Sequence, residues 1–165
     1  MPAHLNAIGP RSVLAQRLAR AGIVALAVAA LALVQPWTGH AQSEVSYRIV
    51  VNSANPVSSL SRNELARLFL KKTIAWQSGG EVRPVDLAED SDVRQAFSKE
   101  ILGKDVSAVK GYWQQLIFTG RGVPPIEKQS EAAVLAFVAA ERYAIGYVST
   151  TASLGSDVRV VHVTP

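Results

Sequence analysis

The sequence predicts an α/β fold, in which a mixed or largely parallel sheet of about four to five strands is covered by about four helices. Short runs of β-branched and apolar residues alternate with longer segments whose apolar residues recur every three or four positions. Capping residues and glycines mark the ends of those longer segments. Alternation of strands with helices along a chain is typical of sheets that are covered by helices.

Residues 1–41 have the pattern of a cleavable secretory signal peptide. They contain no acidic residue, carry arginines ahead of the apolar run 21–34, and end in the small-residue motif Gly39-His40-Ala41. The apolar run is shorter than the roughly 20 residues of a spanning helix, and an uncleaved anchor is the alternative. We therefore expect export to the periplasm, with residues 42–165 as a single α/β domain.

Composition argues against several classes of function. Three of the 17 basic residues precede position 42, which leaves 14 basic against 13 acidic residues in the mature chain, so nucleic-acid binding is not expected. Cysteine is absent, and His162 is the one histidine after the signal, so thiol chemistry, a histidine metal cluster and a Ser-His-Asp triad are not expected. The acids between 86 and 92 lack the pattern of a calcium loop. We expect a protein without cofactor or enzymatic activity.

Four segments have the composition of strands. Each is rich in Val, Ile or Tyr and is bounded by turn residues. Pro84 cannot donate a backbone hydrogen bond, so its segment is expected near a sheet edge. The expected strands are 47–52, 82–87, 144–149 and 158–163.

Four further segments have helical periodicity. The first begins with a capping box, in which Ser61 and Glu64 bond each other's backbone, and it ends near Lys71 and Lys72. The second spans 91–102, with Gly103 suited to its C-terminal cap. The third spans about 106–118, and the fourth starts at Ser130. The apolar residues expected to face the core of the third are Val109, Trp113, Leu116 and Ile117.

Several motifs resemble a known family. The chain contains VVNSANPVSSLSRNELARLFLKKTIAW, VRPVDLAEDSDVRQAFSKEILG, YWQQLIFTGRGVPP and AIGYVS. The N-P-V loop, the helix ending in Phe-Leu-x-Lys before a Trp, and the strand AIGYV are the most specific parts. Together they resemble the short, single-domain relatives of the periplasmic phosphate-binding protein of ABC transporters.

The resemblance implies a single lobe of a type II periplasmic-binding-protein-like fold over residues 42–165. In that family two lobes close on the ligand, and this chain has room for one lobe. The resemblance implies phosphate or another small oxyanion as ligand, and an ABC transporter membrane component or another envelope protein as partner. A second copy of the chain, in a homodimer, would supply the other wall. The alternative is a single-lobe interaction module of the cell envelope that has lost ligand binding.

The resemblance places its ligand loop between a strand and a helix, where free backbone amides suit oxyanions. Ser91 falls at the family's serine and Glu89 at its aspartate, and Arg94 could add positive charge. The departures from the family's loop are Leu87 at the arginine, Asp90 and Asp92 at the two glycines, and Val93 at the threonine. The alternative is that Ser91 only caps the helix, with the acids complementing its dipole.

Two further groups are candidate ligand contacts. Asn52 and Ser53 follow the first strand, and ligands of open α/β sheets lie beyond the carboxyl ends of strands. Thr119 and Arg121 belong to a Thr-Gly-Arg-Gly segment that could form a small anion nest. The alternatives are ordinary turn chemistry for the first pair and a glycine-capped helix end for the second.

Overall fold

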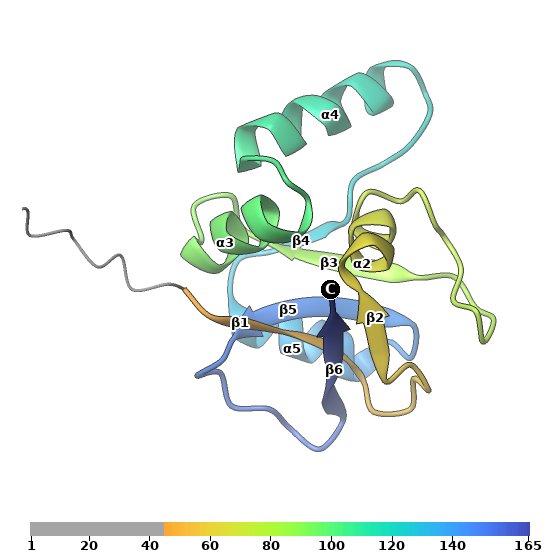
Figure 1. Cartoon of the computed structure of the whole chain (residues 1–165), viewed down its shortest axis with the longest axis vertical. Coiled ribbons are helices and arrows are strands. Elements are labelled where there is room, and N and C mark those ends of the chain that lie inside the picture. The colour runs from red at the N-terminus through yellow and green to blue at the C-terminus, as the bar shows by residue number, and fades with distance from the viewer. Residues whose placement is uncertain (1–44) are drawn as a thin grey trace, which may run out of the picture. The chain divides into compact units, whose positions relative to one another are not determined.

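The computed structural model describes residues 45–165, which form one sheet with helices on both faces (Figure 1). The signal peptide expected at residues 1–41 lies outside the described residues. Within the described range, no helix has both the length and the apolar character needed to cross a membrane. The strands are β1 (Tyr47–Asn52), β2 (Ser59–Ser61), β3 (Arg83–Leu87), β4 (Ile126–Lys128), β5 (Ala144–Ser149) and β6 (Val158–Thr164). The helices are α2 (Arg62–Phe69), α3 (Asp92–Ile101), α4 (Val106–Phe118) and α5 (Glu131–Ala140).

The sheet is mixed, with strand order β2-β6-β1-β5-β3-β4. Strand β1 runs antiparallel to both β5 and β6, whereas β3 runs parallel to β5 and β4, and β2 parallel to β6. The predicted α/β class is confirmed, but the sheet has 6 strands rather than four to five. Both additional strands, β2 and β4, are three residues long, too short to show an alternating pattern.

Pro84 lies on a strand that is internal to the sheet, because β3 has β5 on one side and β4 on the other. The pairing with β4 begins only at Val85, which faces Ile126, so Pro84 has a partner residue on β5 alone. The expectation of an edge position is therefore wrong for the strand as a whole. At Pro84 itself, however, the strand is unpaired on the β4 side. This suits proline, which has no backbone N–H to donate.

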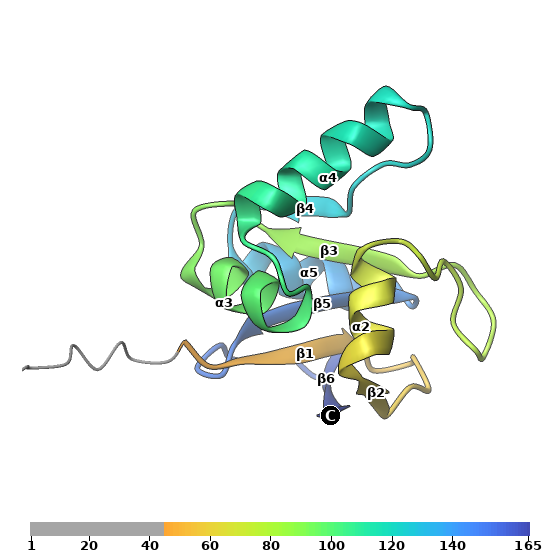
Figure 2. The same ribbon diagram turned by 45° about the horizontal axis from the view of Figure 1, so that its top comes forward.

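Helix α5 covers one face of the sheet, and α2 and α3 lie over the other (Figure 2). On β5, alternate residues face these two layers. Gly146 faces α5, and a Cβ atom there would lie 2.8 Å from a methyl carbon of Val134 and 2.9 Å from one of Val85. Tyr147 faces the other way and stacks on Phe97 of α3 at 3.9 Å between ring centroids. A glycine on β5 thus lets α5 pack closely on the sheet.

Replacing Gly146 by Ala is expected to lower the free energy of unfolding by about 1–3 kcal/mol, because the added methyl group overpacks this contact. The measurement is urea unfolding followed by circular dichroism. Gly111→Ala is the matched control, since nothing lies within 4 Å of a Cβ there. In that exposed position inside α4, alanine is expected to stabilise by about 0.5–1 kcal/mol. Equal effects of the two substitutions would contradict close packing at Gly146.

The helix ends follow the sequence closely. Ser61 and Glu64 form the predicted capping box, Ser91 and Ser130 cap α3 and α5, and Gly103 has a positive φ of 61° after α3. These features depend on residues a few positions apart, which explains why the sequence predicts them.

Helix α4 is less buried than its pattern predicts. Its Val109 and Trp113 are buried, but Ile117 is 53% exposed and Phe118 is 93% exposed. The helix packs mainly on α3, and its C-terminal end projects away from the sheet (Figure 1). The prediction that Ile117 faces the core is therefore wrong, because at this end of α4 it is Leu116 that packs against the core, and Ile117 lies exposed.

Candidate functional site

The loop between β3 and α3 is the first candidate site. Ser91 caps the helix, since its Oγ accepts a hydrogen bond of 3.4 Å from the backbone N–H of Arg94. Within residues 45–165, the backbone N–H groups of Asp92 and Val93 have no recorded acceptor. Free N–H groups and the positive end of the helix dipole are what an anion needs at a helix start.

The charge of this loop is mainly negative. Glu89, Asp90 and Asp92 are all solvent-exposed, and Glu89 accepts a hydrogen bond of 2.9 Å from the Nζ atom of Lys110 on α4. The start of α3 thus carries three carboxylates, of which Glu89 pairs with the ammonium of Lys110. Carboxylates within several ångströms of a bound oxyanion repel it, although water weakens the repulsion.

Arg94 does not extend toward the loop surface. Its side chain is 6% exposed, its Nη1 lies 2.7 Å from Oδ2 of Asp86, and it donates to the carbonyl of Leu87 at 3.1 Å. The hydroxyl of Tyr147 donates to the other oxygen of Asp86 at 2.8 Å. In this structure the guanidinium therefore neutralises a buried carboxylate beneath the sheet–helix loop.

Burial dominates the protonation of this group of side chains. It raises the pKa of Asp86 from 3.8 to about 6, while the charge of Arg94 and the hydrogen bond from Tyr147 act in the opposite direction. Burial, together with the nearby charge of Asp86, also raises the pKa of the Tyr147 hydroxyl, which stays protonated as a donor. Without its cationic partner, an ionised carboxylate in this buried position would destabilise the folded protein.

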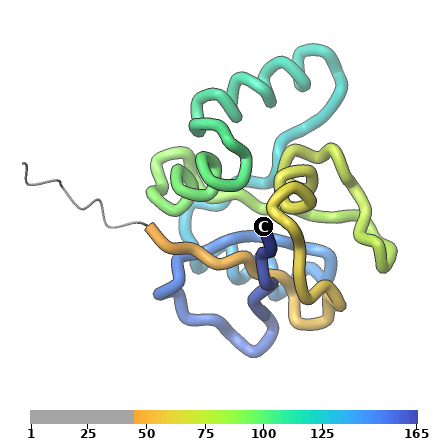
Figure 3. The backbone as a smooth tube through the Cα atoms, viewed as in Figure 1, coloured from red at the N-terminus to blue at the C-terminus, as the bar shows by residue number. Residues whose placement is uncertain are grey.

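Asn52 and Ser53 lie at the opposite end of the sheet from Ser91. Strand β1 is antiparallel to β5, which is parallel to β3, so the carboxyl ends of β1 and β3 point in opposite directions (Figure 3). The Asn52 amide donates to the carbonyls of Val138 and Ala139 at 3.0 and 2.7 Å, and it thereby binds the end of α5. Ser53 is exposed, and its backbone N–H donates to the carbonyl of Asp157.

Thr119 and Arg121 lie at a third place. The Thr119 hydroxyl donates to the carbonyl of Gln115 at 2.9 Å, and the backbone N–H of Arg121 donates to Leu116, with Gly120 at a φ of 66° between them. This arrangement is a Schellman motif that ends α4. Thr119 lies nine residues beyond Lys110, or about 13 Å along the helix axis. The structure therefore does not bring the three candidate groups into one site.

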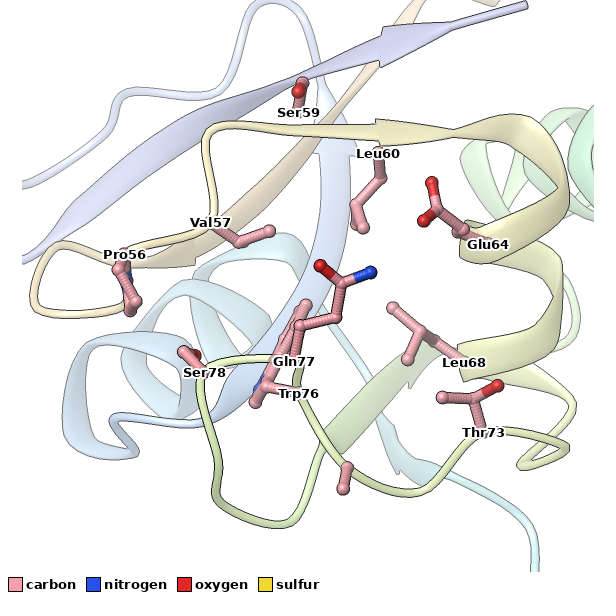
Figure 4. Close-up of a pocket in the computed structure, with 11 residues that line it drawn as sticks. Pro56, Val57, Ser59, Leu60, Glu64, Leu68, Thr73, Trp76, Gln77 and Ser78 are labelled. Carbon is pink, nitrogen blue, oxygen red and sulfur yellow. The ribbon is translucent and has the colours of Figure 1, made fainter.

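The sequence did not predict a cavity of about 410 Å³ that lies between β2, α2 and the loop 73–78 (Figure 4). Its walls come from the N-P-V loop and from the segment that ends in Trp76. Both segments carry the family resemblance. The lining residues are Pro56, Val57, Ser59, Leu60, Glu64, Leu68, Thr73, Ala75, Trp76, Gln77 and Ser78.

Across residues 45–165, no three His, Cys, Asp or Glu side chains are grouped so that they could hold a metal ion. His162 is exposed on β6. Trp113 is buried, as the helical pattern predicts, and so is Trp76, whose indole N–H donates to the carbonyl of Tyr143 at 3.1 Å.

Comparison with known proteins identifies the fold. No protein-family model and no curated protein matches the chain. Among solved structures, an ABC-type phosphate transport receptor from Vibrio cholerae matches with a TM-score of 0.57 at 20% identity, covering 72% of this chain and 46% of the receptor. A putative phosphate ABC transporter substrate-binding protein with bound phosphate from Clostridium perfringens matches with the same TM-score and identity, covering 72% and 44%. PstS from Borrelia burgdorferi matches with a TM-score of 0.55 at 10% identity, covering 72% and 47%.

These comparisons confirm the fold class that the motifs predict. The chain has the α/β fold of substrate-binding proteins of the phosphate type, and it spans less than half the length of the structures that it matches. Those structures are named as receptors and binding proteins rather than as enzymes. At 10–20% identity, the likeness defines the fold.

Proposed function

We propose that this chain is a periplasmic solute-binding-type protein, exported through the signal peptide at residues 1–41, with phosphate or another small oxyanion as its ligand. A link to ABC-type phosphate uptake, through a membrane component of the transporter, is part of the proposal. The observation that supports it most is the common fold with phosphate receptors, at a TM-score of 0.57.

The proposed anion site is the start of α3. Ser91 and the backbone N–H groups of Asp92 and Val93 are the donors, as expected where a helix N-terminus receives an oxyanion. Arg94 contributes indirectly, by holding Asp86 and the loop above it. The exposed carboxylates of Glu89, Asp90 and Asp92 make the binding weak, so we expect affinity in the millimolar range rather than tight capture.

The double substitution Asp90→Asn with Asp92→Asn is expected to raise the affinity for phosphate by about tenfold, because it removes two charges near the anion. Isothermal titration calorimetry at low ionic strength, with phosphate and sulfate, measures the effect, which added salt should reduce. Asp157→Asn is the control, since it removes an exposed charge beside Ser53, at the opposite end of the sheet from Ser91. If neither the parent protein nor the double variant shows heat or thermal stabilisation with millimolar phosphate, anion binding is refuted.

A second candidate function is a protein-interaction module of the cell envelope. It is favoured by four exposed apolar side chains near the end of α4, the following loop and β4, which are Ile117, Phe118, Val123 and Ile126. Exposed apolar side chains that form a continuous patch are typical of protein contacts. Light scattering during the same phosphate titration separates the candidates. Concentration-dependent association without any phosphate effect would favour this second function.

A further inference from the structure

The cavity between β2, α2 and the loop 73–78 has the size and lining of a small-molecule site. Its volume of about 410 Å³ falls in the range of roughly 300–1,000 Å³ that is usual for ligand pockets. Apolar side chains form much of its wall, and a few polar groups converge on it. The apolar members are Pro56, Val57, Leu60, Leu68, Ala75 and Trp76.

Glu64 is the one charged residue in the lining of this cavity. Its Oε2 atom accepts hydrogen bonds from the backbone N–H and the hydroxyl of Ser61, at 2.8 and 2.7 Å. These bonds lower the pKa of the Glu64 carboxyl, so it is ionised at neutral pH. Glu64 takes part in no ion pair within the described residues, and its Oε1 has no recorded donor there. A negative charge held in place by the helix cap thus faces the cavity.

The remaining polar groups are less fixed. The Gln77 side chain is exposed and has no recorded hydrogen bond within residues 45–165, and Figure 4 shows its amide directed into the space between Leu60 and Trp76. The Trp76 ring is fixed by the hydrogen bond from its indole N–H to the carbonyl of Tyr143. A rigid aromatic wall, a fixed carboxylate and a movable amide are groups that orient an amphipathic ligand.

From this arrangement we infer that the cavity binds a small organic cation, in which an aromatic or apolar body lies against Trp76 and Leu68 and an ammonium group pairs with Glu64. The site is separate from the anion site, because β2, α2 and the loop 73–78 form it rather than the start of α3. The same ammonium chemistry could come from a free amine or from the N-terminus of a peptide with an aromatic first residue.

The test uses benzylamine as the probe and nuclear magnetic resonance of the purified protein as the readout. Benzylamine is expected to shift the Trp76 indole signal with a dissociation constant on the order of 1 mM, as suits a ligand of this size. Trp113, which lies on α4, serves as an internal reference that does not shift. Benzyl alcohol and benzoate, which have the same ring without the positive charge, are expected to bind at least fivefold more weakly.

Glu64→Gln is the decisive variant. Glutamine preserves the capping box, so the fold is retained, while benzylamine affinity is expected to fall about fivefold through loss of the ion pair. Glu127→Gln, which changes a carboxylate on β4, is expected to bind benzylamine as the parent protein does. The tripeptide Phe-Gly-Gly tests the peptide source, and tighter binding than benzylamine would assign the site to chain N-termini.

Three results would overturn the inference. The first is no shift of Trp76 at 20-fold excess over the expected constant, roughly 20 mM. The second is equal binding of benzyl alcohol, and the third is unchanged affinity in Glu64→Gln. None of these results bears on phosphate binding at α3, since Glu64→Gln is expected to leave the phosphate titration unaltered.

Discussion

Replacing Arg94 by Met is expected to lower the free energy of unfolding by about 3–5 kcal/mol at pH 8, because it leaves the buried carboxylate of Asp86 without its cation. Methionine fills much of the same volume, so the loss reports on charge rather than on a cavity. Urea unfolding measures it. The control is Arg83→Met, because the ion pair between Arg83 and Glu141 is exposed and is worth at most about 1 kcal/mol.

The loss in Arg94→Met should depend on pH in a defined direction. The pKa of Asp86 in the folded protein is about 6, above its ordinary value of 3.8. A raised folded-state pKa stabilises the protein below pH 3.8, and that stability is lost as the pH rises through about 6. Without Arg94 this pKa rises further, so the deficit should be smaller at pH 5 than at pH 8. A deficit equal at both pH values would contradict the ion pair as its cause.

Adding Asp86→Asn to Arg94→Met should recover part of the lost stability, because the double variant buries no charge. A fully additive loss would mean that the two side chains do not depend on each other. It would also mean that the ion pair with Asp86 is not what holds Arg94 in its inward position.

Replacing Phe97 by Ala is expected to cost about 3–5 kcal/mol, the second of the two largest effects. Phe97 is fully buried and stacks on Tyr147 at 3.9 Å, and the rings of Phe69 and Tyr47 lie at 4.7 and 5.7 Å. The substitution removes all of these contacts and leaves a cavity between α3 and the sheet. Thermal and urea unfolding both report the change.

The matched control is Phe118→Ala. The same atoms are removed there from a side chain that is 93% exposed, so the expected change in unfolding free energy is within about 0.5 kcal/mol. A large loss in this variant would show that Phe118 packs against something in solution, such as a partner or a second copy. A small loss in Phe97→Ala would contradict its place at the centre of the aromatic cluster.

Local features of this chain follow from the sequence alone. The capping box at Ser61 and Glu64, the caps at Ser91 and Ser130, and the bounds of α4 at 106–118 all agree with the structure. Each depends on hydrogen bonds or periodicity within a few residues, which the order of amino acids specifies directly. The buried strands β1 and β5 are also predictable from the sequence, because each is a nearly continuous run of β-branched and apolar residues.

Other features arise only where distant segments meet. The sequence does not specify that β1 opposes β3 in direction, and this geometry separates Asn52 from Ser91. Nor does the sequence indicate that Arg94, in the first turn of a helix, turns inward to Asp86, or that Ile117 lies exposed. The cavity beside Glu64 likewise requires α2, β2 and the loop 73–78 to converge.

The sequence by itself therefore determined the α/β class, the helix ends and the strands with continuous apolar runs, since local bonding and periodicity act over a few residues. Only the tertiary structure decided which of the candidate residues lie close together in space. Strand direction and pairing set the position of a side chain in space, and these depend on packing energies summed over the whole sheet.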